Sequence, residues 1–134
     1  MQLKVSTDYA IRIVLHLAVK GGAATSSEIS GQMGIPRSVI ATLAKPLQKA
    51  GILTTQRGTG GGFALGRRPE DISLHEIVNL MEGTTRINRC LEPDGFCSRK
   101  GTVSCSVHRF FLREQEKLER SFREMTIAKL LSDE

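Results

Sequence analysis

Apolar residues recur at helical spacing through the first fifty residues of the chain. Over 7–19 they fall three and four positions apart, which predicts an amphipathic helix with one buried face. Residues 25–28 are Thr-Ser-Ser-Glu, the spacing of a capping box, and they predict a short second helix that ends near Met33. A third helix is expected over 36–49, where the proline at its first position costs no hydrogen bond and Pro46 should kink the last turn. The glycine-containing turn between these two helices predicts a helix-turn-helix.

A β-hairpin and a fourth helix are expected next. Residues 52–55 are rich in β-branched side chains, and the glycine-rich run 57–62 turns the chain into a second short strand at 63–65. Residues 73–76, Ser-Leu-His-Glu, form a second capping box, which predicts a helix that Gly83 closes. A helix-turn-helix followed by a hairpin is a winged helix.

The C-terminal segment carries an apolar stripe along a stretch otherwise rich in Glu, Arg and Lys. No Pro or Gly occurs from Cys105 to Leu131, so a single long helix is expected there. Such a helix stands outside a small core and needs a surface to cover its stripe, for which homodimerisation is the simplest answer. The alternative is a helix folded back on its own domain, and partial docking is compatible with dimerisation. The stripe consists of Phe110, Phe111, Leu118, Phe122, Met125 and Leu130.

The predicted fold is mainly α with a small β-hairpin, a winged helix-turn-helix joined to a long C-terminal dimerisation helix. A chain of 134 residues can form one compact domain with an appended helix, but not two independent cores. We expect a DNA-binding domain over 1–83, a cysteine-containing loop over 84–107 and the dimerisation helix over 108–134.

The net charge of +5 is unevenly divided between the two halves. Residues 1–69 hold nine Lys or Arg against two acidic residues, whereas residues 70–134 hold ten basic and twelve acidic residues. A basic N-terminal half is suited to the phosphates of a nucleic acid. With no Trp, one Tyr and five Phe, the chain has few rings on which single-stranded bases could stack, so duplex DNA is the expected partner.

The helix over 36–49 is the expected major-groove reader of the winged helix. Arg57 and the glycines after it can enter the minor groove, where arginine is attracted and glycine allows close approach. A nucleotide-phosphate loop is the weaker interpretation, because these glycines join two strands and no Gly-Lys-Ser or Gly-Lys-Thr is present. The expected DNA contacts are Ser27, Arg37, Ser38, Ala41, Thr42, Lys45, Arg57, Gly58, Thr59 and Gly60.

Several classes of protein are disfavoured. No apolar run approaches the roughly twenty residues that span a bilayer, and Lys4, Asp8 and Arg12 interrupt any N-terminal signal, so we expect a cytoplasmic protein without a membrane partner. A nucleotide loop, a paired-carboxylate site and a nucleophile–base arrangement are all missing, so we do not expect an enzyme. For contact with RNA polymerase the sequence gives no indication.

The only cysteines are Cys90, Cys97 and Cys105, in the loop over 84–107. An odd number in a reducing compartment argues against a disulfide framework and for metal ligation or thiol chemistry. Their gaps of six and seven residues are wider than those of zinc ribbons, so spacing alone leaves a metal site only slightly ahead of three unrelated thiols. The loop context favours a metal, because thiolates suit iron–sulfur clusters or zinc and nearby basic residues should lower thiol pKa values.

Three thiolates leave one ligand position open. His108 is a candidate because it follows Cys105 by three residues and so shares a helix face with it. The other candidates are Asp8 of the partner subunit, Glu92, Asp94 or a small molecule. The remaining two histidines lie inside predicted helices and are assigned structural roles.

The sequence resembles the Rrf-two family of winged-helix regulators over nearly its whole length. The resemblance is carried by Thr-Asp-Tyr-Ala at 7–10, Gly-Ile at 34–35, Ala-Gly at 50–51, Arg-Gly-Thr-Gly-Gly-Gly-Phe at 57–63 and the helix over 72–83. In such proteins the helix equivalent to 36–49 reads the major groove, the wing enters the minor groove, and the long helix dimerises.

The resemblance also implies a cofactor, because three cysteines in this loop of the family hold a two-iron or four-iron cluster. It implies Cys90, Cys97 and Cys105 as ligands, although family members usually have shorter, five-residue gaps. Members of the IscR type use a histidine as fourth ligand, which His108 matches, whereas those of the NsrR type use an acidic residue of the partner, which Asp8 matches.

We therefore expect a homodimeric transcriptional regulator that acts as a repressor at a double-stranded DNA operator. It should sense redox state, nitric oxide or iron–sulfur status through a cysteine-ligated iron–sulfur cluster, with four-iron favoured over two-iron. The alternative is a cluster-free regulator of the same family that responds by thiol oxidation or to a small effector.

Overall fold

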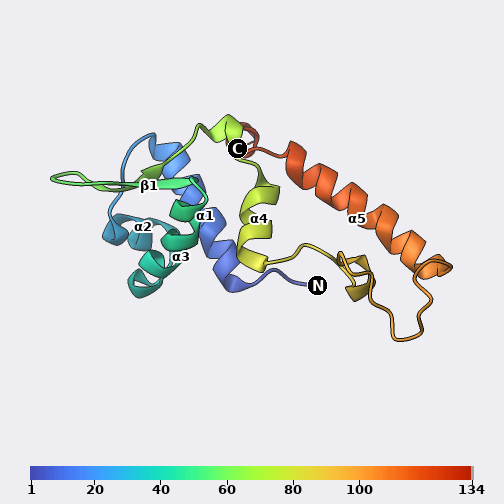
Figure 1. Ribbon diagram of the computed structural model, residues 1–134. Helices are drawn as coiled ribbons and strands as arrows, with labels where there is room; N and C mark the ends of the chain where they lie inside the picture. The colour runs from blue at the N-terminus through green and yellow to red at the C-terminus, as the bar shows by residue number, and fades with distance from the viewer. Residues whose placement is uncertain (134) are drawn as a thin grey trace.

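The computed structural model describes residues 1–133. A helical domain with a projecting hairpin forms one end of the molecule, and the long helix α5 extends from it toward the other end (Figure 1). This mainly helical architecture with a two-stranded hairpin confirms the predicted fold class. The elements are α1 (Val5–Lys20), α2 (Ser26–Met33), α3 (Arg37–Lys49), β1 (Leu53–Gln56), β2 (Gly62–Leu65), η1 (Pro69–Asp71), α4 (Leu74–Glu82), η2 (Arg89–Leu91), α5 (Ser106–Glu124) and α6 (Ile127–Ser132).

The core lies between the first four helices. Residues three and four apart on α1 bury one face of that helix, and α3 buries Ile40, Leu43 and Leu47 on its inner face. Gly34 ends α2 in the left-handed conformation, at φ +67°, and so makes the tight turn of the predicted helix-turn-helix. Helix α3 remains one element through Pro46 to Lys49 and begins one residue later than expected, because Pro36 is its extended N-cap.

Both predicted capping boxes form only in part. The amide of Glu28 donates to the Thr25 hydroxyl at 3.2 Å, and the amide of Glu76 donates to the hydroxyl of Ser73 at 3.1 Å. The carboxylates do not reach back to the caps, because that of Glu28 accepts from Lys20 and that of Glu76 accepts from an arginine. Each glutamate therefore links two elements rather than closing its own helix end.

The hairpin is held to the domain by a backbone bridge. Strand β1 pairs antiparallel with β2, and Phe63 exchanges two hydrogen bonds of 2.8 and 2.9 Å with Ala24, which precedes α2. Gly62, at φ +136°, allows this approach, since a Cβ there would lie 2.2 Å from the Ala24 carbonyl oxygen. The base of the wing is thus fixed, while residues 57–60 form an exposed tip.

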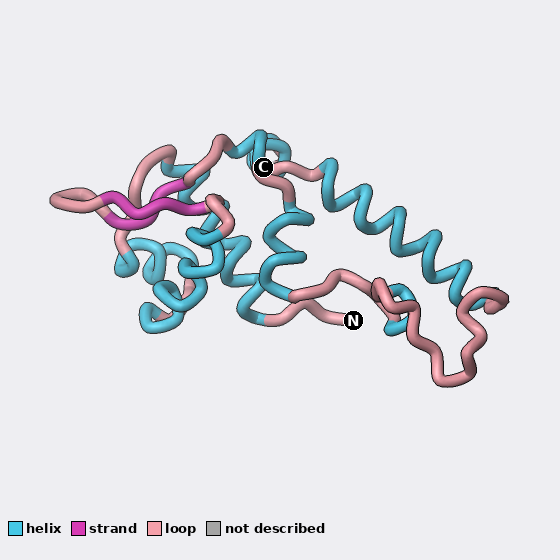
Figure 2. The backbone as a smooth tube through the Cα atoms, viewed as in Figure 1, coloured by secondary structure: helices cyan, strands magenta, loops and turns pink. Residues whose placement is uncertain are grey.

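The expectation of one helix from Cys105 to Leu131 is wrong. Helix α5 ends at Glu124, and a short loop separates it from α6 (Figure 2). The reason is a contact with a distant segment, in which the Leu74 amide donates to the Met125 carbonyl at 2.8 Å and the Ile127 amide donates to the Ile72 carbonyl at 2.9 Å.

Helix α6 packs back on the N-terminal domain, with Ile127 fully buried in the common core. Of the segment 108–134 predicted for dimerisation, α6 is thus docked on that domain, and only α5 extends beyond it. Helix α5 packs against α4 and η2 but leaves Val107, Phe110 and Leu112 between 41% and 55% exposed. Within residues 1–133, no helix has the length and apolar character needed to cross a membrane.

Candidate nucleic-acid interface and cysteine site

The residues expected to contact DNA lie on the surface at the hairpin end of the molecule (Figure 1). One face of α3 exposes Arg37, Ser38, Ala41, Thr42 and Lys45, while its opposite face is buried in the core. Ser27 is exposed on α2, and 57–60 is exposed at the wing tip. Because α3 is amphipathic, the side that could enter the major groove of DNA remains exposed.

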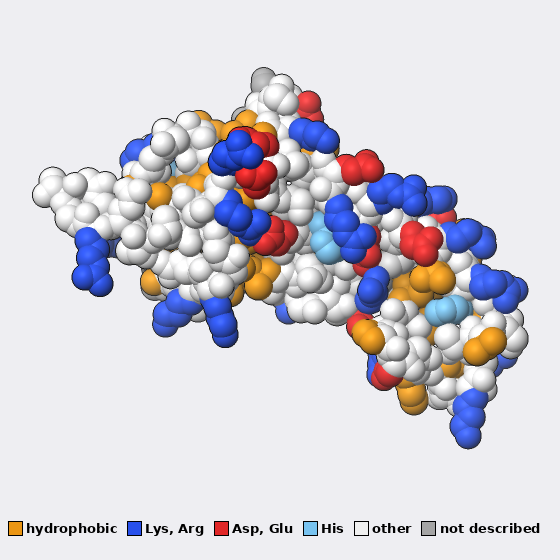
Figure 3. Space-filling model, turned by 45° about the horizontal axis from the view of Figure 1, so that its top comes forward, with side chains coloured by type: hydrophobic (Ala, Val, Ile, Leu, Met, Phe, Trp, Pro, Cys, Tyr) orange, Lys and Arg blue, Asp and Glu red, His pale blue; other side chains and the backbone are white. Residues whose placement is uncertain are grey.

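The basic groups of this end are not neutralised by the protein. Among residues 1–133, no carboxylate forms an ion pair with Arg37, Lys45 or Arg57. On the face drawn in Figure 3, the hairpin end shows Lys and Arg side chains but no acidic ones. Exposed cations without an acidic partner are available to DNA phosphates.

The three cysteines line one hollow of about 270 Å³ at the far end of α5, which we call the cysteine hollow. Each is partly buried and none forms a disulfide. His108 joins two of them, because its Nδ1 lies 3.2 Å from the Cys90 sulfur and its backbone amide donates to the Cys105 sulfur at 3.4 Å. The lining residues are Asn88, Arg89, Cys90, Phe96, Cys97, Ser98, Thr102, Cys105, Val107 and His108.

The third thiol, Cys97, lies in a turn that favours its thiolate. Backbone amides of Gly101 and Arg99 point at the sulfur and lower its pKa, with a smaller contribution from the Arg99 charge. The expected lowering therefore holds for Cys97, but mainly because of amide donors rather than basic side chains. A sulfur of this kind is a better metal ligand and nucleophile than an ordinary thiol.

Three of the four candidate fourth ligands are engaged elsewhere. Asp94 receives two hydrogen bonds of 2.6 and 2.7 Å from Arg89, which lower the pKa of Asp94 to about 2. Glu92 accepts from the Thr84 hydroxyl at 2.6 Å, and Asp8 pairs with an arginine on α1 at 2.6 Å. Only His108 lies in the cysteine hollow of its own chain.

The cysteine hollow has the donors that an iron–sulfur cluster requires, namely three thiols and one imidazole. Among residues 1–133, however, no three Cys, His, Asp or Glu side chains gather around one point as ligands of a single metal ion do. The donor chemistry and its location thus fit a cluster, while the side chains are not arranged as a closed mononuclear site.

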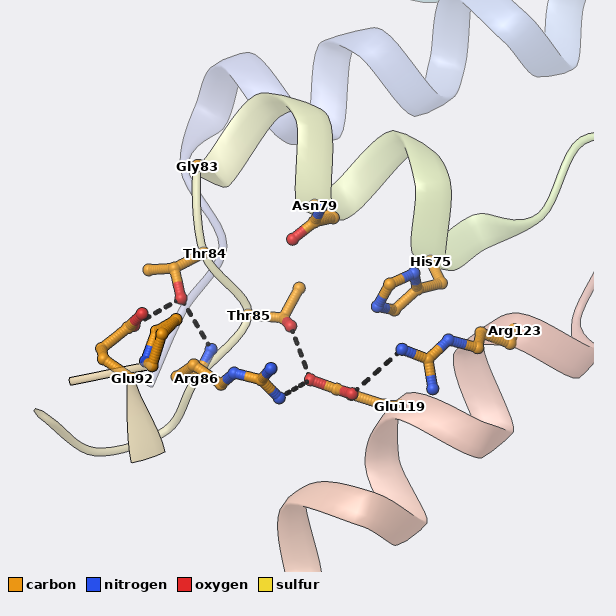
Figure 4. A pocket seen from close by; sticks show the side chains of 10 residues that line it. His75, Asn79, Gly83, Thr84, Thr85, Arg86, Glu92, Glu119 and Arg123 are labelled. Atoms are coloured by element: carbon orange, nitrogen blue, oxygen red, sulfur yellow. Dashed lines mark hydrogen bonds and ion pairs between the residues drawn. The ribbon is translucent and has the colours of Figure 1, made fainter. Parts of the chain in front are cut away.

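A second hollow, of about 240 Å³, was not foreseen from the sequence. It lies between α4, the segment after it and α5, and we call it the polar hollow (Figure 4). At its centre is Glu119, which is 8% exposed. The sequence signal was the polar spacing of four along α5, at Gln115, Glu119 and Arg123. The hollow is lined by His75, Asn79, Gly83, Thr84, Thr85, Arg86, Glu92, Pro93, Glu119 and Arg123.

The Glu119 carboxylate accepts four hydrogen bonds. One oxygen receives Arg86 at 2.5 Å, Gln115 at 3.0 Å and Thr85 at 3.1 Å, and the other receives Arg123 at 3.2 Å. Burial alone would raise the pKa of Glu119, but these hydrogen bonds and the two arginine charges together lower it. The carboxylate therefore remains ionised and ties α5 to the segment that follows α4.

Comparison with known proteins identifies the kind of chain that this is. Residues 3–133 match the family model Rrf2, described as an iron-dependent transcriptional regulator. A Haemophilus influenzae protein described as an HTH-type transcriptional regulator is 30% identical over 134 positions, which cover 98% of this chain and 87% of that protein. The HTH-type transcriptional regulator IscR of Klebsiella pneumoniae is 26% identical over 136 positions, covering 100% of this chain and 82% of IscR.

Solved structures show the same fold. CymR, the global cysteine regulator of B. subtilis, aligns with a TM-score of 0.81 and 22% identity, over 100% of this chain and 98% of CymR. T. potens IscR aligns with a TM-score of 0.76 and 22% identity, over 99% of this chain and 88% of that one. These relatives are DNA-binding regulators rather than enzymes.

Proposed function

Because the chain belongs to the Rrf2 family of transcriptional regulators, we propose that it binds a double-stranded DNA operator as a homodimer and represses transcription there. One observation carries this proposal: α3 and the wing tip present exposed Arg37, Lys45 and Arg57 without acidic partners among residues 1–133. The other residues proposed to contact DNA are Ser27, Ser38, Ala41, Thr42, Gly58, Thr59 and Gly60.

The proposed dimer contact is the exposed apolar face of α5. Val107 and Phe110, three residues apart and therefore on one side of α5, are 55% and 50% exposed on a helix that projects away from the N-terminal DNA-binding domain. A second copy of the same helix would cover this face in a two-fold arrangement. It would also set the separation of the two α3 helices, and hence the spacing of the operator half-sites.

We further propose that Cys90, Cys97 and Cys105 hold an iron–sulfur cluster, four-iron in preference to two-iron. His108 is the proposed fourth ligand, and Asp8 of the partner subunit is the alternative. When bound, the cluster would supply sensitivity to redox state, nitric oxide or iron–sulfur supply. Support comes from the donor set of the cysteine hollow, the iron-dependent description of the family and the similarity to IscR.

The link from this loop to the reading head runs through α5. Cys105 caps the first turn of α5, since its sulfur accepts from the His108 amide. After its last turn, Met125 and Ile127 form backbone hydrogen bonds with Leu74 and Ile72 of the N-terminal DNA-binding domain. A displacement of Cys105 would move α5 as a rigid rod, and a shift of about 1 Å at a dimer helix can change half-site fit.

A second candidate keeps DNA binding and replaces the cluster by thiol chemistry. It is favoured by Cys97, because amide donors lower the pKa of this thiol and the thiolate is the reactive form, and by the presence of Cys90 and Cys105 in the same hollow. Iron and sulfide analysis distinguishes the two, since a thiol switch needs a reactive pair of cysteines but no iron.

Binding to duplex DNA at several salt concentrations tests the regulatory proposal. Fluorescence anisotropy with a random duplex should show affinity that falls steeply as salt rises, and sedimentation should give two chains per duplex site. A flat salt response, or one chain per site, would contradict the proposed mode of binding.

A further inference from the structure

The polar hollow is separate from the cysteine hollow, and the two have no lining residue in common. Its volume of about 240 Å³ lies below the roughly 300–1,000 Å³ typical of sites for drug-sized ligands. A hollow of this size admits a small metabolite or an inorganic ion. Nearly all of its lining side chains are polar, which excludes an apolar occupant.

The lining of the polar hollow holds two guanidinium groups and two carboxylates, and both guanidinium groups pair with the same carboxylate. Figure 4 shows the Glu119 carboxylate between two guanidinium groups, those of Arg86 and Arg123. The other acid in the lining, Glu92, is hydrogen bonded to the Thr84 hydroxyl. Among residues 1–133, no second carboxylate pairs with either arginine, so both guanidinium groups keep N–H donors that Glu119 alone does not use.

His75, on α4, lies within reach of both arginine charges. Burial lowers its pKa first, and the charges of Arg123 and Arg86 lower it further, against an opposing effect of Glu119. A neutral imidazole can donate one hydrogen bond to an anion without adding charge to the site. The Asn79 side chain also faces the hollow and can donate from its amide group (Figure 4).

Both arginines retain donors for a ligand. Arg86 uses Nη1 and Arg123 uses Nη2 in their bonds to Glu119, and their side chains are 37% and 60% exposed. A guanidinium group carries five N–H donors in a planar fork that matches a carboxylate or a phosphate. We propose that the polar hollow binds a small oxyanion, a carboxylate or phosphate group of a compact metabolite, between Arg86 and Arg123.

A ligand in the polar hollow would contact α4, the segment that connects α4 to η2 and its flanks, and α5. His75 and Asn79 belong to α4, Arg86 and Glu92 to the connecting segment, and Arg123 to α5. Glu92 is also separated by one residue from Cys90 of the cysteine hollow. An anion bound here would hold α5 against the N-terminal DNA-binding domain. It would thereby alter the affinity for the operator, independently of the cluster.

Titration of the iron-free 134-residue chain with inorganic phosphate, followed by amide NMR, tests the proposal. Sodium chloride at matched ionic strength is the control, and acetate is a second arm that separates carboxylate from phosphate preference. We expect saturable shifts of the amides of 84–86 and of the Asn79 side chain. Arg123→Gln should weaken phosphate binding about tenfold, because one charge-assisted contact is lost.

Arg120→Gln is the matched control, because Arg120 is exposed on the same helix and does not line the polar hollow. It should leave the phosphate affinity unchanged. Arg86→Gln gives a second test should one arginine dominate. Shifts that never saturate, or equal affinities in all three variants, would overturn the proposal. DNA binding would be unaffected by that outcome, so the regulatory proposal is judged independently.

Discussion

The Nδ1 atom of His108 lies 3.2 Å from the sulfur of Cys90, across the mouth of the cysteine hollow. The two residues come from different elements, the first turn of α5 and η2. Asp8, the other candidate ligand, is on α1 and pairs with Arg12 at 2.6 Å. The geometry of a single chain therefore favours His108 as the partner of the three thiols.

Replacing His108 should affect cofactor retention more than replacing Asp8. If the imidazole is the fourth ligand, His108→Ala should lower the iron bound per chain and shift the visible absorption, because one ligand is lost. Asp8→Asn serves as the matched comparison and should leave both unchanged. The reverse pattern would assign the position to Asp8 of the partner subunit.

Removing the wing arginine should weaken DNA binding without changing stability. Arg57 is exposed and forms no ion pair among residues 1–133, so Arg57→Ala should remove only the proposed contact to DNA. The slope of log affinity against log salt should fall in magnitude by about 1. Arg120→Ala, an exposed change on α5, should keep the original slope. Loss of thermal stability in Arg57→Ala would show a structural role instead.

Adding one methyl group at the base of the wing should detach it. Gly62→Ala would bring a Cβ within 2.2 Å of the Ala24 carbonyl oxygen at a φ of +136°. We expect a loss of roughly 1–3 kcal/mol in the free energy of unfolding, with weaker DNA binding, measured by denaturation and anisotropy. Gly22→Ala is the control, since a Cβ there meets nothing within 4 Å, and it should change stability by less than about 0.5 kcal/mol.

The sequence predicted the helix-turn-helix well because each element carries its own boundary residues. Thr25 caps α2, Gly34 ends it, and the spacing within α3 separates buried from exposed positions. The break in the last helix could not be predicted in this way. Thr126 caps α6 by accepting from the Lys129 amide at 3.2 Å, but a threonine alone does not end a helix, and the break also depends on the long-range bridge between Ser73 and Thr126.

Truncating the buried residue of α6 should test how firmly that helix is docked. Ile127 is fully buried in the core of the N-terminal DNA-binding domain, so Ile127→Ala should lower the free energy of unfolding by about 2–5 kcal/mol. Val103→Ala removes apolar atoms from a residue that is 99% exposed and should be nearly neutral. Equal effects of the two changes would mean that α6 does not pack against the domain in solution.

The stability of the protein should decrease between pH 7 and pH 5, in part through His75. Its pKa in the folded state is lowered from 6.5 by burial and by the arginine charges around it. As the pH falls below about 6.5, the unfolded chain therefore takes up this proton first, and the free energy of unfolding falls. His75→Gln should reduce this pH dependence in denaturant titrations. If the pH dependence of the free energy of unfolding were the same in His75→Gln, His75 would not be its cause.

The cysteine site was only partly predictable. The proximity of His108 to Cys105 follows from their three-residue spacing at the start of a helix. The contact of His108 with Cys90, eighteen residues away, and that of Arg86 with Glu119, thirty-three residues away, depend on how the loop folds against α5. Sequence spacing identified the donors, whereas tertiary packing decides which of them meet.

Iron and acid-labile sulfide per chain, measured with the visible spectrum of anaerobically purified protein, test the proposed sensor most directly. Coloured protein containing both elements is predicted, and Cys90→Ala, Cys97→Ala and Cys105→Ala should each abolish the colour and the iron. Colourless, iron-free protein with three titratable thiols would contradict the account.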